Sequence, residues 1–180
     1  MKATGIVRRI DDLGRIVIPK EIRRTMHIRE GDPLEIYTDK DGGVIFRKYS
    51  PVGELSTFAG QICEALQKAA GGVAAVFDRD GVIAFSGAPK RELMDKRMSP
   101  ELEELMELRG IYRAEGSAPP VPAVRDDERY SVLVAAPILA EGDVLGCVTF
   151  LGSEKDAQAG QTEEKLAAAV AGFLGRQMEG

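Results

Sequence analysis

"GRIVIPKEIRR", residues 14–24, places a short apolar segment among positive charges. Arg15 to Ile18 have the composition of a buried strand, and Pro19 stops that strand because it lacks a backbone N–H. Pro19 also suits the first position of a helix, where its restricted φ angle is already helical. The stretch therefore predicts a strand that leads directly into a short helix with basic residues on its surface.

The sequence around this stretch predicts a small unit with four strands. Residues 5–10, GIVRRI, have strand composition, and DDLG at residues 11–14 is typical of a turn. Farther along, the apolar segments 34–37 and 44–46 flank DKDGG at residues 39–43, which is a strong hairpin signal. The expected order is strand, strand, helical turn, strand, strand.

This unit is too small to bury a stable core alone. It ends near residue 49, contains neither cysteine of the chain, and has no residues at the spacing of zinc ligands. Its strands would leave unpaired edges and uncovered apolar faces. We therefore expect an obligate homodimer through an N-terminal domain of residues 1–49.

A second domain is expected after this unit. Residues 50–54 have the composition of a linker, and residues 55–180 begin with apolar positions at three- and four-residue spacing, which predicts an amphipathic helix. Two long apolar strands are expected at 130–139 and 144–151, and a final helix after Thr162. The pattern predicts an α+β domain with an antiparallel sheet and flanking helices.

Charge is distributed unevenly along the chain. The net charge is −5, but residues 1–50 carry +3 and residues 51–180 carry −8. Residues 1–24 contain seven Lys or Arg and only three Asp or Glu. A basic front end on an acidic chain indicates a polyanion partner for that end, although an ordinary solvated surface would give the same count.

Several classes of function have little support. The one histidine, His27, lies at the end of the expected helical turn with no serine or cysteine near it in sequence, so we expect a helix-end or core role. Zinc-ligand spacing and both phosphate-loop patterns are missing. No long apolar run or signal-peptide core occurs, so we expect a cytoplasmic protein without a membrane span. Cys63 and Cys147 are interpreted as small buried hydrophobes, and we expect neither an enzyme nor a metal or cofactor site.

The N-terminal sequence resembles the DNA-binding domain of the AbrB-type transition-state regulators. Residues 1–37 read MKATGIVRRIDDLGRIVIPKEIRRTMHIREGDPLEIY and contain the specific pattern D-x-L-G-R-[IV]-[VI]-[IL]-P-x-E-[IL]-R. The resemblance covers residues 1–48 without a gap. It implies an all-β swapped-hairpin barrel formed by a dimer, in which two chains interleave their strands. This agrees with the separate argument from core size.

The C-terminal sequence resembles the GAF-like domain of the sporulation regulators in this family. The resemblance is looser in the middle and good at the last helix, where residues 171–179 read AGFLGRQME. It implies a sequence-specific DNA-binding transcriptional regulator, activator or repressor, of late forespore sporulation genes. It also implies a homotetramer in which the GAF-like domains pair through their terminal helices.

The resemblance assigns DNA contacts to four arginines: Arg8, Arg15, Arg23 and Arg24. Charge and position add three further candidates: Arg9, Lys2 and Lys20. A hairpin would place Arg8 and Arg9 near Arg15, and a two-fold dimer would present each position twice. Because Arg forms bidentate hydrogen bonds to phosphates and guanine edges, double-stranded DNA is the expected partner, read largely through its shape.

The second domain has two interpretations. It could sense an unidentified small-molecule effector, held by the sheet around residues 77–85, the loop 114–123 and the strand 130–138. It could instead serve only assembly, which the small residues of the last helix support: Ala167, Ala168, Ala171, Gly172 and Gly175. A GAF-fold methionine sulfoxide reductase would need clustered cysteines, and this domain has two isolated ones.

Two other functions compete with transcription regulation. Some antitoxins of toxin–antitoxin pairs share the swapped-hairpin head, but they usually end in a short disordered tail that wraps the toxin. Here residues 55–180 are expected to fold instead. A small-molecule sensor that acts through protein partners would use the head only to dimerise.

Overall fold

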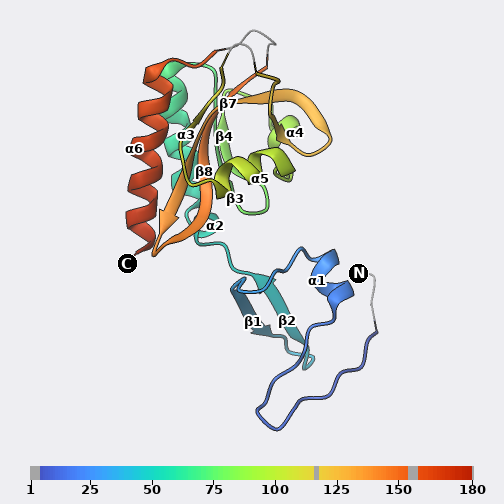
Figure 1. Cartoon of the computed structure of the whole chain (residues 1–180). Coiled ribbons are helices and arrows are strands. Elements are labelled where there is room, and N and C mark those ends of the chain that lie inside the picture. Colours follow the sequence, from blue (N-terminus) through green and yellow to red (C-terminus); the bar gives the residue numbers. More distant parts are fainter. Residues whose placement is uncertain (1–4, 116–117, 154–157, 180) are drawn as a thin grey trace. The chain divides into compact units, whose positions relative to one another are not determined.

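The chain divides into two compact units, Met1–Tyr49 and Ser50–Gly180. The computed structural model describes residues 5–115, 118–153 and 158–179 (Figure 1). None of the helices in these ranges is long and apolar enough to cross a membrane.

The N-terminal unit contains one short helix and one hairpin. Helix α1, Lys20–Thr25, precedes the antiparallel strands β1, Leu34–Thr38, and β2, Val44–Lys48 (Figure 1). The Asp39 carboxylate accepts hydrogen bonds from the backbone N–H groups of Asp41 and Gly43, which stabilises the turn between the strands. The predicted helical turn and the predicted second hairpin are therefore both present.

His27 lies just beyond the C-cap of helix α1 and terminates the helix, which is the helix-end role that the sequence favours for this residue. His27 has a positive φ of 52°, its N–H donates to the Arg24 carbonyl at 3.3 Å, and the Ile28 N–H donates to the Arg23 carbonyl at 2.8 Å. These two bonds form a Schellman motif, in which a residue with left-handed backbone conformation ends the helix. Ile28 then turns inward and is buried.

The two N-terminal strands predicted at 5–10 and 15–18 are not formed within a single chain. Residues 5–19 are two extended arms joined by a turn, and no strand is assigned in them. Their apolar side chains face solvent, with Val7 93% and Val17 72% exposed. A strand needs a neighbouring backbone to complete its hydrogen bonds, and beyond the bond at the turn from the Asp11 N–H to the Arg15 carbonyl the described part of this chain supplies none to the arms.

The C-terminal unit is an antiparallel sheet between two layers of helices. The strand order is β4-β3-β8-β7-β5, and β6 pairs with β7. The strands are β3, Val73–Asp78; β4, Val82–Ser86; β5, Tyr112–Arg113; β6, Pro122–Val124; β7, Asp127–Ala140; and β8, Asp143–Gly152. The helices are α2, Pro51–Glu54; α3, Ser56–Ala70; α4, Lys90–Leu93; α5, Pro100–Glu107; and α6, Gln161–Met178. This is the α+β arrangement that the sequence predicts.

Each face of the sheet has its own apolar core. Helices α3 and α6 cover one face of the sheet (Figure 1). Leu66 and Leu174 belong there to the same buried cluster as Phe150. Helices α4 and α5 cover the other face, where Leu93 and Met106 pack with sheet residues. Alternate residues of β3 point to opposite faces, as a strand requires, so this unit buries both surfaces of its sheet without a partner.

Residues 50–54 correct the expectation of a linker. They form helix α2, which the Ser50 hydroxyl caps by accepting a hydrogen bond from the Gly53 N–H at 2.9 Å. Ser50 Oγ also donates to Asp78 Oδ2 at 2.8 Å, and Val52 is fully buried in the core. The Ser-Pro pair that suggested a linker is here an N-cap followed by proline at the first helical position.

The small residues of α6 face mainly inward. Ala167, Ala171 and Gly175 are buried against the unit's own sheet, whereas Gly172 is exposed. A Cβ atom on Gly175 would lie 2.2 Å from the Leu139 carbonyl oxygen. The expectation that this small-residue side is available for packing another subunit is therefore wrong for most of its members, because β7 already occupies it.

Two glycines of α6 give a matched test of this packing. We expect Gly175→Ala to lower the free energy of unfolding by about 1–3 kcal/mol, since the added methyl group meets rigid backbone. Gly172→Ala meets no atom within 4 Å and should raise the free energy of unfolding by up to about 1 kcal/mol through helix propensity. Denaturant unfolding of both variants measures the two effects, and equal behaviour would contradict the observed orientation of α6.

Candidate nucleic-acid interface

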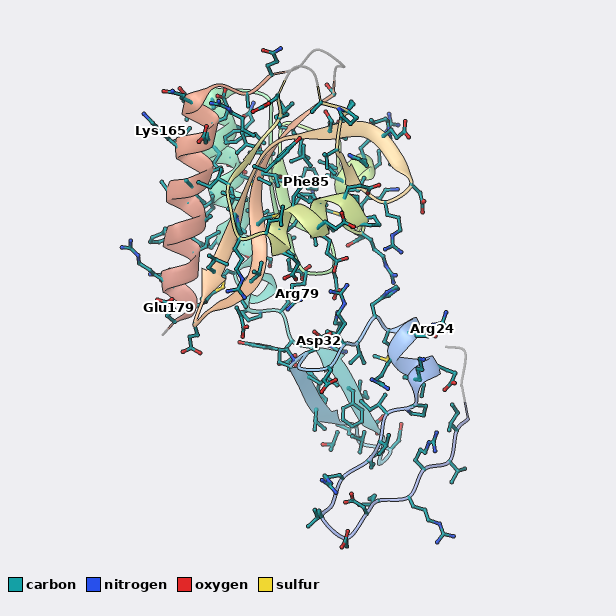
Figure 2. All side chains as sticks on the ribbon, viewed as in Figure 1. Arg24, Asp32, Arg79, Phe85, Lys165 and Glu179 are labelled. Atoms are coloured by element: carbon teal, nitrogen blue, oxygen red, sulfur yellow. The ribbon has the colours of Figure 1, made fainter. Side chains whose placement is uncertain are left out.

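The cations predicted to contact DNA lie on the surface of the N-terminal unit. Six of the seven are in the described residues, and all six are exposed: Arg8, Arg9, Arg15, Lys20, Arg23 and Arg24. Lys2 lies outside the described residues. The first two are on the first arm, Arg15 follows the turn, and the last three are on α1, where Figure 2 labels Arg24. These cations thus come from two consecutive segments of the N-terminal unit, the arms and α1.

The turn between the arms is organised by Asp11. Its backbone N–H donates to the Arg15 carbonyl at 3.0 Å, and its carbonyl accepts from the Gly14 N–H at 3.0 Å. Its carboxylate accepts from the backbone N–H of Leu13 at 3.0 Å and of Arg15 at 2.8 Å. Gly14 has a φ of +75°, which favours glycine at this position. This is an Asx-type turn, in which an Asp side chain takes the part of backbone.

Asp11 also holds the side chain of Arg15. Oδ2 of Asp11 accepts a hydrogen bond from Arg15 Nε at 2.8 Å. The backbone hydrogen bond from Arg15, followed by the bond from its side chain, lowers the pKa of the Asp11 carboxyl. The sequence predicts Asp11 only as a turn residue. The sequence signal for its contact with Arg15 is an aspartate placed four residues before an arginine across a glycine turn.

Other cations of this unit are engaged by its own hairpin. Lys48 lies 3.6 Å from the Asp32 carboxylate, which also accepts the Arg29 N–H at 2.8 Å. The Arg47 guanidinium lies 5.3 Å from the centre of the Tyr37 ring, within the range of a cation–π contact. Arg47 and Lys48 therefore differ from the arginines of the arms and α1, since each contacts a side chain of the same unit.

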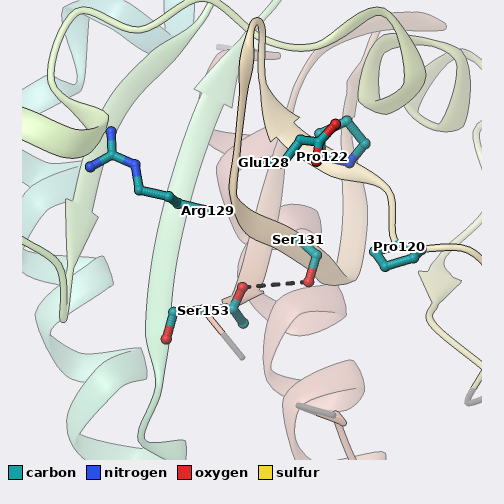
Figure 3. Close-up of a pocket in the computed structure, with 7 residues that line it drawn as sticks. Pro120, Pro122, Glu128, Arg129, Ser131 and Ser153 are labelled. Atoms are coloured by element: carbon teal, nitrogen blue, oxygen red, sulfur yellow. Dashed lines mark hydrogen bonds between the residues drawn. The ribbon is translucent and has the colours of Figure 1, made fainter. Parts of the chain in front are cut away.

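A pocket in the C-terminal unit lies at the start of β7. Its volume is about 290 Å³, and Figure 3 shows its lining: Pro120, Pro122, Glu128, Arg129, Ser131, Gly152 and Ser153. Ser131 Oγ donates to the Gly152 carbonyl at 3.4 Å. Three of these residues belong to the loop 114–123 and the strand 130–138, where the sequence analysis placed an effector. Residues 116–117 of that loop lie outside the described residues.

The third region proposed for an effector, residues 77–85, does not line this pocket. Phe77 is fully buried, and it belongs to the core that α4 and α5 cover. The described residues contain no group of three or more His, Cys, Asp or Glu side chains that could hold a metal ion.

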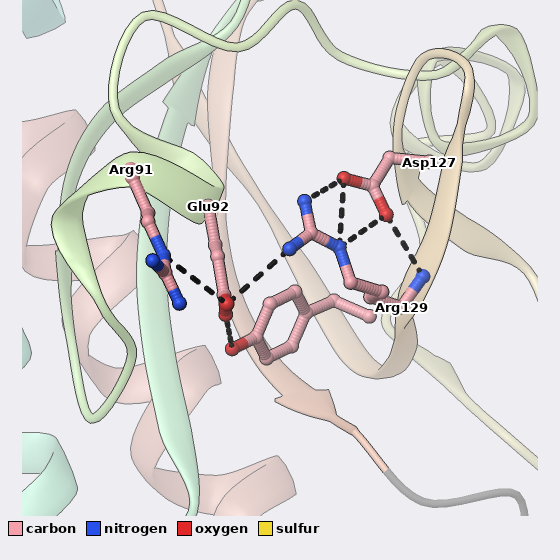
Figure 4. A network of polar contacts seen from close by, with 5 residues as sticks. Arg91, Glu92, Asp127 and Arg129 are labelled. Carbon is pink, nitrogen blue, oxygen red and sulfur yellow. Dashed lines mark hydrogen bonds and ion pairs between the residues drawn. The ribbon is translucent and has the colours of Figure 1, made fainter.

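The arginine that borders the pocket is already paired with two carboxylates. Arg129 Nε lies 2.9 Å from Asp127 Oδ1, and Arg129 Nη1 lies 3.2 Å from Glu92 Oε1 (Figure 4). The Tyr130 hydroxyl donates to Glu92 Oε2 at 2.6 Å, so this network fastens α4 to β7. Because Arg129 is neutralised in place, the pocket has no free cation from this residue with which to select an anion.

Comparison with known proteins identifies the family. A family model described as "Stage V sporulation protein T C-terminal, transcription factor" matches residues 54–179. Stage V sporulation protein T of Bacillus subtilis (strain 168) is 49% identical over 180 residues, with 99% of each chain covered. The chain belongs to the stage V sporulation protein T family. It is a transcription regulator of sporulation.

Further comparisons match the two units of this family member separately. The transition state regulatory protein AbrB of Bacillus subtilis (strain 168) is 50% identical over 72 residues, which are 40% of this chain and 73% of AbrB. A model described as "Antidote-toxin recognition MazE, bacterial antitoxin" matches residues 7–54. The GAF domain of a phosphoenolpyruvate-protein phosphotransferase from Coxiella burnetii covers 69% of this chain and 82% of its own, at 17% identity and a TM-score of 0.55. The AbrB-type and GAF-like resemblances are thus confirmed.

The network around Arg129 predicts how this family member responds to acid. Hydrogen bonds from the Arg129 side chain lower the pKa of Asp127 from 3.8 to about 2. Since the folded pKa is below the unfolded one, the stabilisation is present above about pH 4 and is lost as the pH falls through about 2. We therefore expect the difference in free energy of unfolding between wild type and Asp127→Asn to shrink over that range.

Asp126→Asn provides the control, since Asp126 is adjacent to Asp127 in the chain and exposed. It removes the same charge one residue away without removing the hydrogen bonds between Asp127 and Arg129, so a difference between the two variants reports those bonds. Urea unfolding at several pH values measures both variants, and a constant difference for Asp127→Asn would contradict the network.

Proposed function

We propose that this protein binds double-stranded DNA through the exposed arginines of its N-terminal unit and regulates late sporulation genes. The observation that carries the proposal is the exposed cationic set on the arms and α1, in a chain whose net charge is −5. Arginine suits this role because its fork of donors matches both phosphate oxygens and guanine edges. The AbrB relatives, one of whose solved domains is named a DNA recognition domain, support the same partner.

The binding form is a homodimer through the N-terminal units. Within the described part of that unit, Pro19 and Ile28 are the only buried residues. A second copy would supply strands beside the arms and cover apolar side chains such as Val7 and Val17, which gives a swapped-hairpin barrel. Each arginine would then occur twice, on the two sides of a two-fold axis that matches the symmetry of a duplex.

The C-terminal units assemble these dimers into a tetramer. Phe58 of α3 and Phe173 of α6 form an exposed aromatic pair, with ring centres 6.0 Å apart and exposed fractions of 39% and 46%. Exposed aromatic side chains of this size are typical of interfaces. In this proposal the GAF-like unit also senses a small effector, for which the pocket at the start of β7 is the candidate site.

The antitoxin alternative is less well supported. The antitoxin model matches only residues 7–54, while the sporulation model accounts for residues 54–179. The place of a toxin-wrapping tail is therefore occupied by a folded unit with two apolar cores. A sensor that acts only through protein partners would leave the exposed arginines without a role.

Loss of single arginines tests the DNA assignment. We expect Arg15→Ala and Arg23→Ala each to weaken binding of a genomic fragment selected by the wild-type protein by at least about tenfold, with unchanged circular dichroism. The wild-type affinity should fall steeply with salt as phosphate contacts release counterions. Electrophoretic mobility shifts over a salt series measure both effects. Lys40→Ala, an equal charge change at the exposed hairpin turn, is the control, and equal effects of all three substitutions would refute the assignment.

The aromatic pair predicts the assembly interface. We expect Phe173→Ser to convert the tetramer into a dimer, because it removes half of an exposed aromatic pair. Lys165→Ser, an exposed position on the same helix (Figure 2), should leave the tetramer intact. Sedimentation velocity at micromolar concentration measures the mass, and a Phe173→Ser tetramer would exclude this surface.

A further inference from the structure

We propose that Asp11 is a positioning residue for Arg15, and that it sets the ratio of specific to nonspecific DNA binding. The inference rests on the proposed DNA-binding function and assigns a role to a residue with the wrong charge for binding DNA. Asp11 belongs to the basic front end, yet its carboxylate would repel phosphate. Its presence beside an arginine that contacts DNA therefore needs a reason other than affinity.

The geometry gives that reason. Asp11 uses one carboxylate oxygen to hold the backbone of the turn and the other to hold Arg15 through Nε at 2.8 Å. The terminal nitrogens of Arg15 have no partner among the described residues, and its side chain is 68% exposed. The guanidinium is thus held through Nε, and its two terminal nitrogens are left to bind a ligand. These are the nitrogens with which arginine reads O6 and N7 of guanine or grips a phosphate.

A guanidinium held in this way gains selectivity at the cost of charge. An unrestrained arginine can bind a phosphate in many positions, because its long side chain adopts many rotamers. Ordering that side chain on binding costs conformational entropy. Asp11 restricts that freedom before DNA arrives, which favours the one geometry that fits the correct site. The same carboxylate lowers the net positive charge of the surface and so weakens nonspecific attraction. Both effects raise the ratio of specific to nonspecific binding.

The carboxylate is available for this role at neutral pH. Hydrogen bonds from the backbone and side chain of Arg15 lower the pKa of Asp11 below its usual value, so the group is ionised under ordinary conditions. Asp11→Asn separates its two functions. An amide oxygen can still accept the Leu13 and Arg15 backbone N–H groups, but the amide nitrogen that replaces the other oxygen cannot accept from Arg15 Nε.

The next residue supplies the matched control. Asp12 is also exposed, and Asp12→Asn removes the same charge one residue away. The hydrogen bonds and the ion pair that hold Arg15 at this turn involve Asp11 and not Asp12. A difference between the two variants therefore reports the contact with Arg15 rather than the net charge.

The experiment compares two duplexes of equal length. One is a fragment that the full-length wild-type protein selects from sheared genomic DNA, and the other is the same sequence scrambled. We expect Asp11→Asn to lower the ratio of the two affinities about tenfold, while binding the scrambled duplex at least as tightly as wild type. Asp12→Asn should keep the wild-type ratio. A ratio for Asp11→Asn within twofold of that for Asp12→Asn would overturn the inference.

A double-mutant cycle covers the case in which Asp11→Asn merely loosens the turn. If Asp11 acts through Arg15, then adding Asp11→Asn to Arg15→Ala should leave the ratio unchanged. A further fall of similar size in that background would show an effect that does not pass through Arg15 and would overturn the inference. If the wild-type protein itself prefers no fragment, the proposed function fails first and the role of Asp11 fails with it.

Discussion

The N-terminal unit cannot cover its own apolar side chains, and the rest of the account depends on that constraint. Its arms carry apolar residues on an extended backbone, and no strand lies beside them in the described part of the chain. The second copy that we propose would meet both needs, because it would bring backbone for the hydrogen-bond ladder and side chains for the core. The same pairing would present each arginine twice, so the proposed dimer would link the stability of this unit to its DNA binding.

The C-terminal unit has the opposite character. Both faces of its sheet are filled by apolar side chains, and its two cysteines are buried. Burial raises the pKa of the Cys63 thiol to about 12 and also raises that of Cys147, so neither is a ready thiolate for redox chemistry.

The sequence predicted the parts of the fold that local chemistry determines. The turn residues that begin at Asp39 predict the hairpin of β1 and β2. Pro19 and the residues that come after it predict α1. The strands of the arms could not be placed in a single chain, because their hydrogen-bond partners are not local. Residues 50–54 were mistaken for a linker since proline begins helices as readily as it interrupts them.

The same limit explains the outcome for the candidate site. Positive charge and the AbrB-type pattern identified exposed arginines, because charge and spacing are visible in sequence. The part played by Asp11 was missed, since it depends on which atoms a turn brings within hydrogen-bond distance. The inward direction of Gly175 was missed for a similar reason, as composition alone does not reveal which face of α6 meets β7.

Amide hydrogen–deuterium exchange of the intact protein tests the central claim most directly. If two copies pair their arms, the amides of residues 6–10 and 15–18 should exchange as slowly as those of β1 and β2, although the described residues of one chain give these arms no strand partner. Exchange in these segments at the rate of an unstructured peptide, at concentrations where the protein binds DNA, would contradict the account.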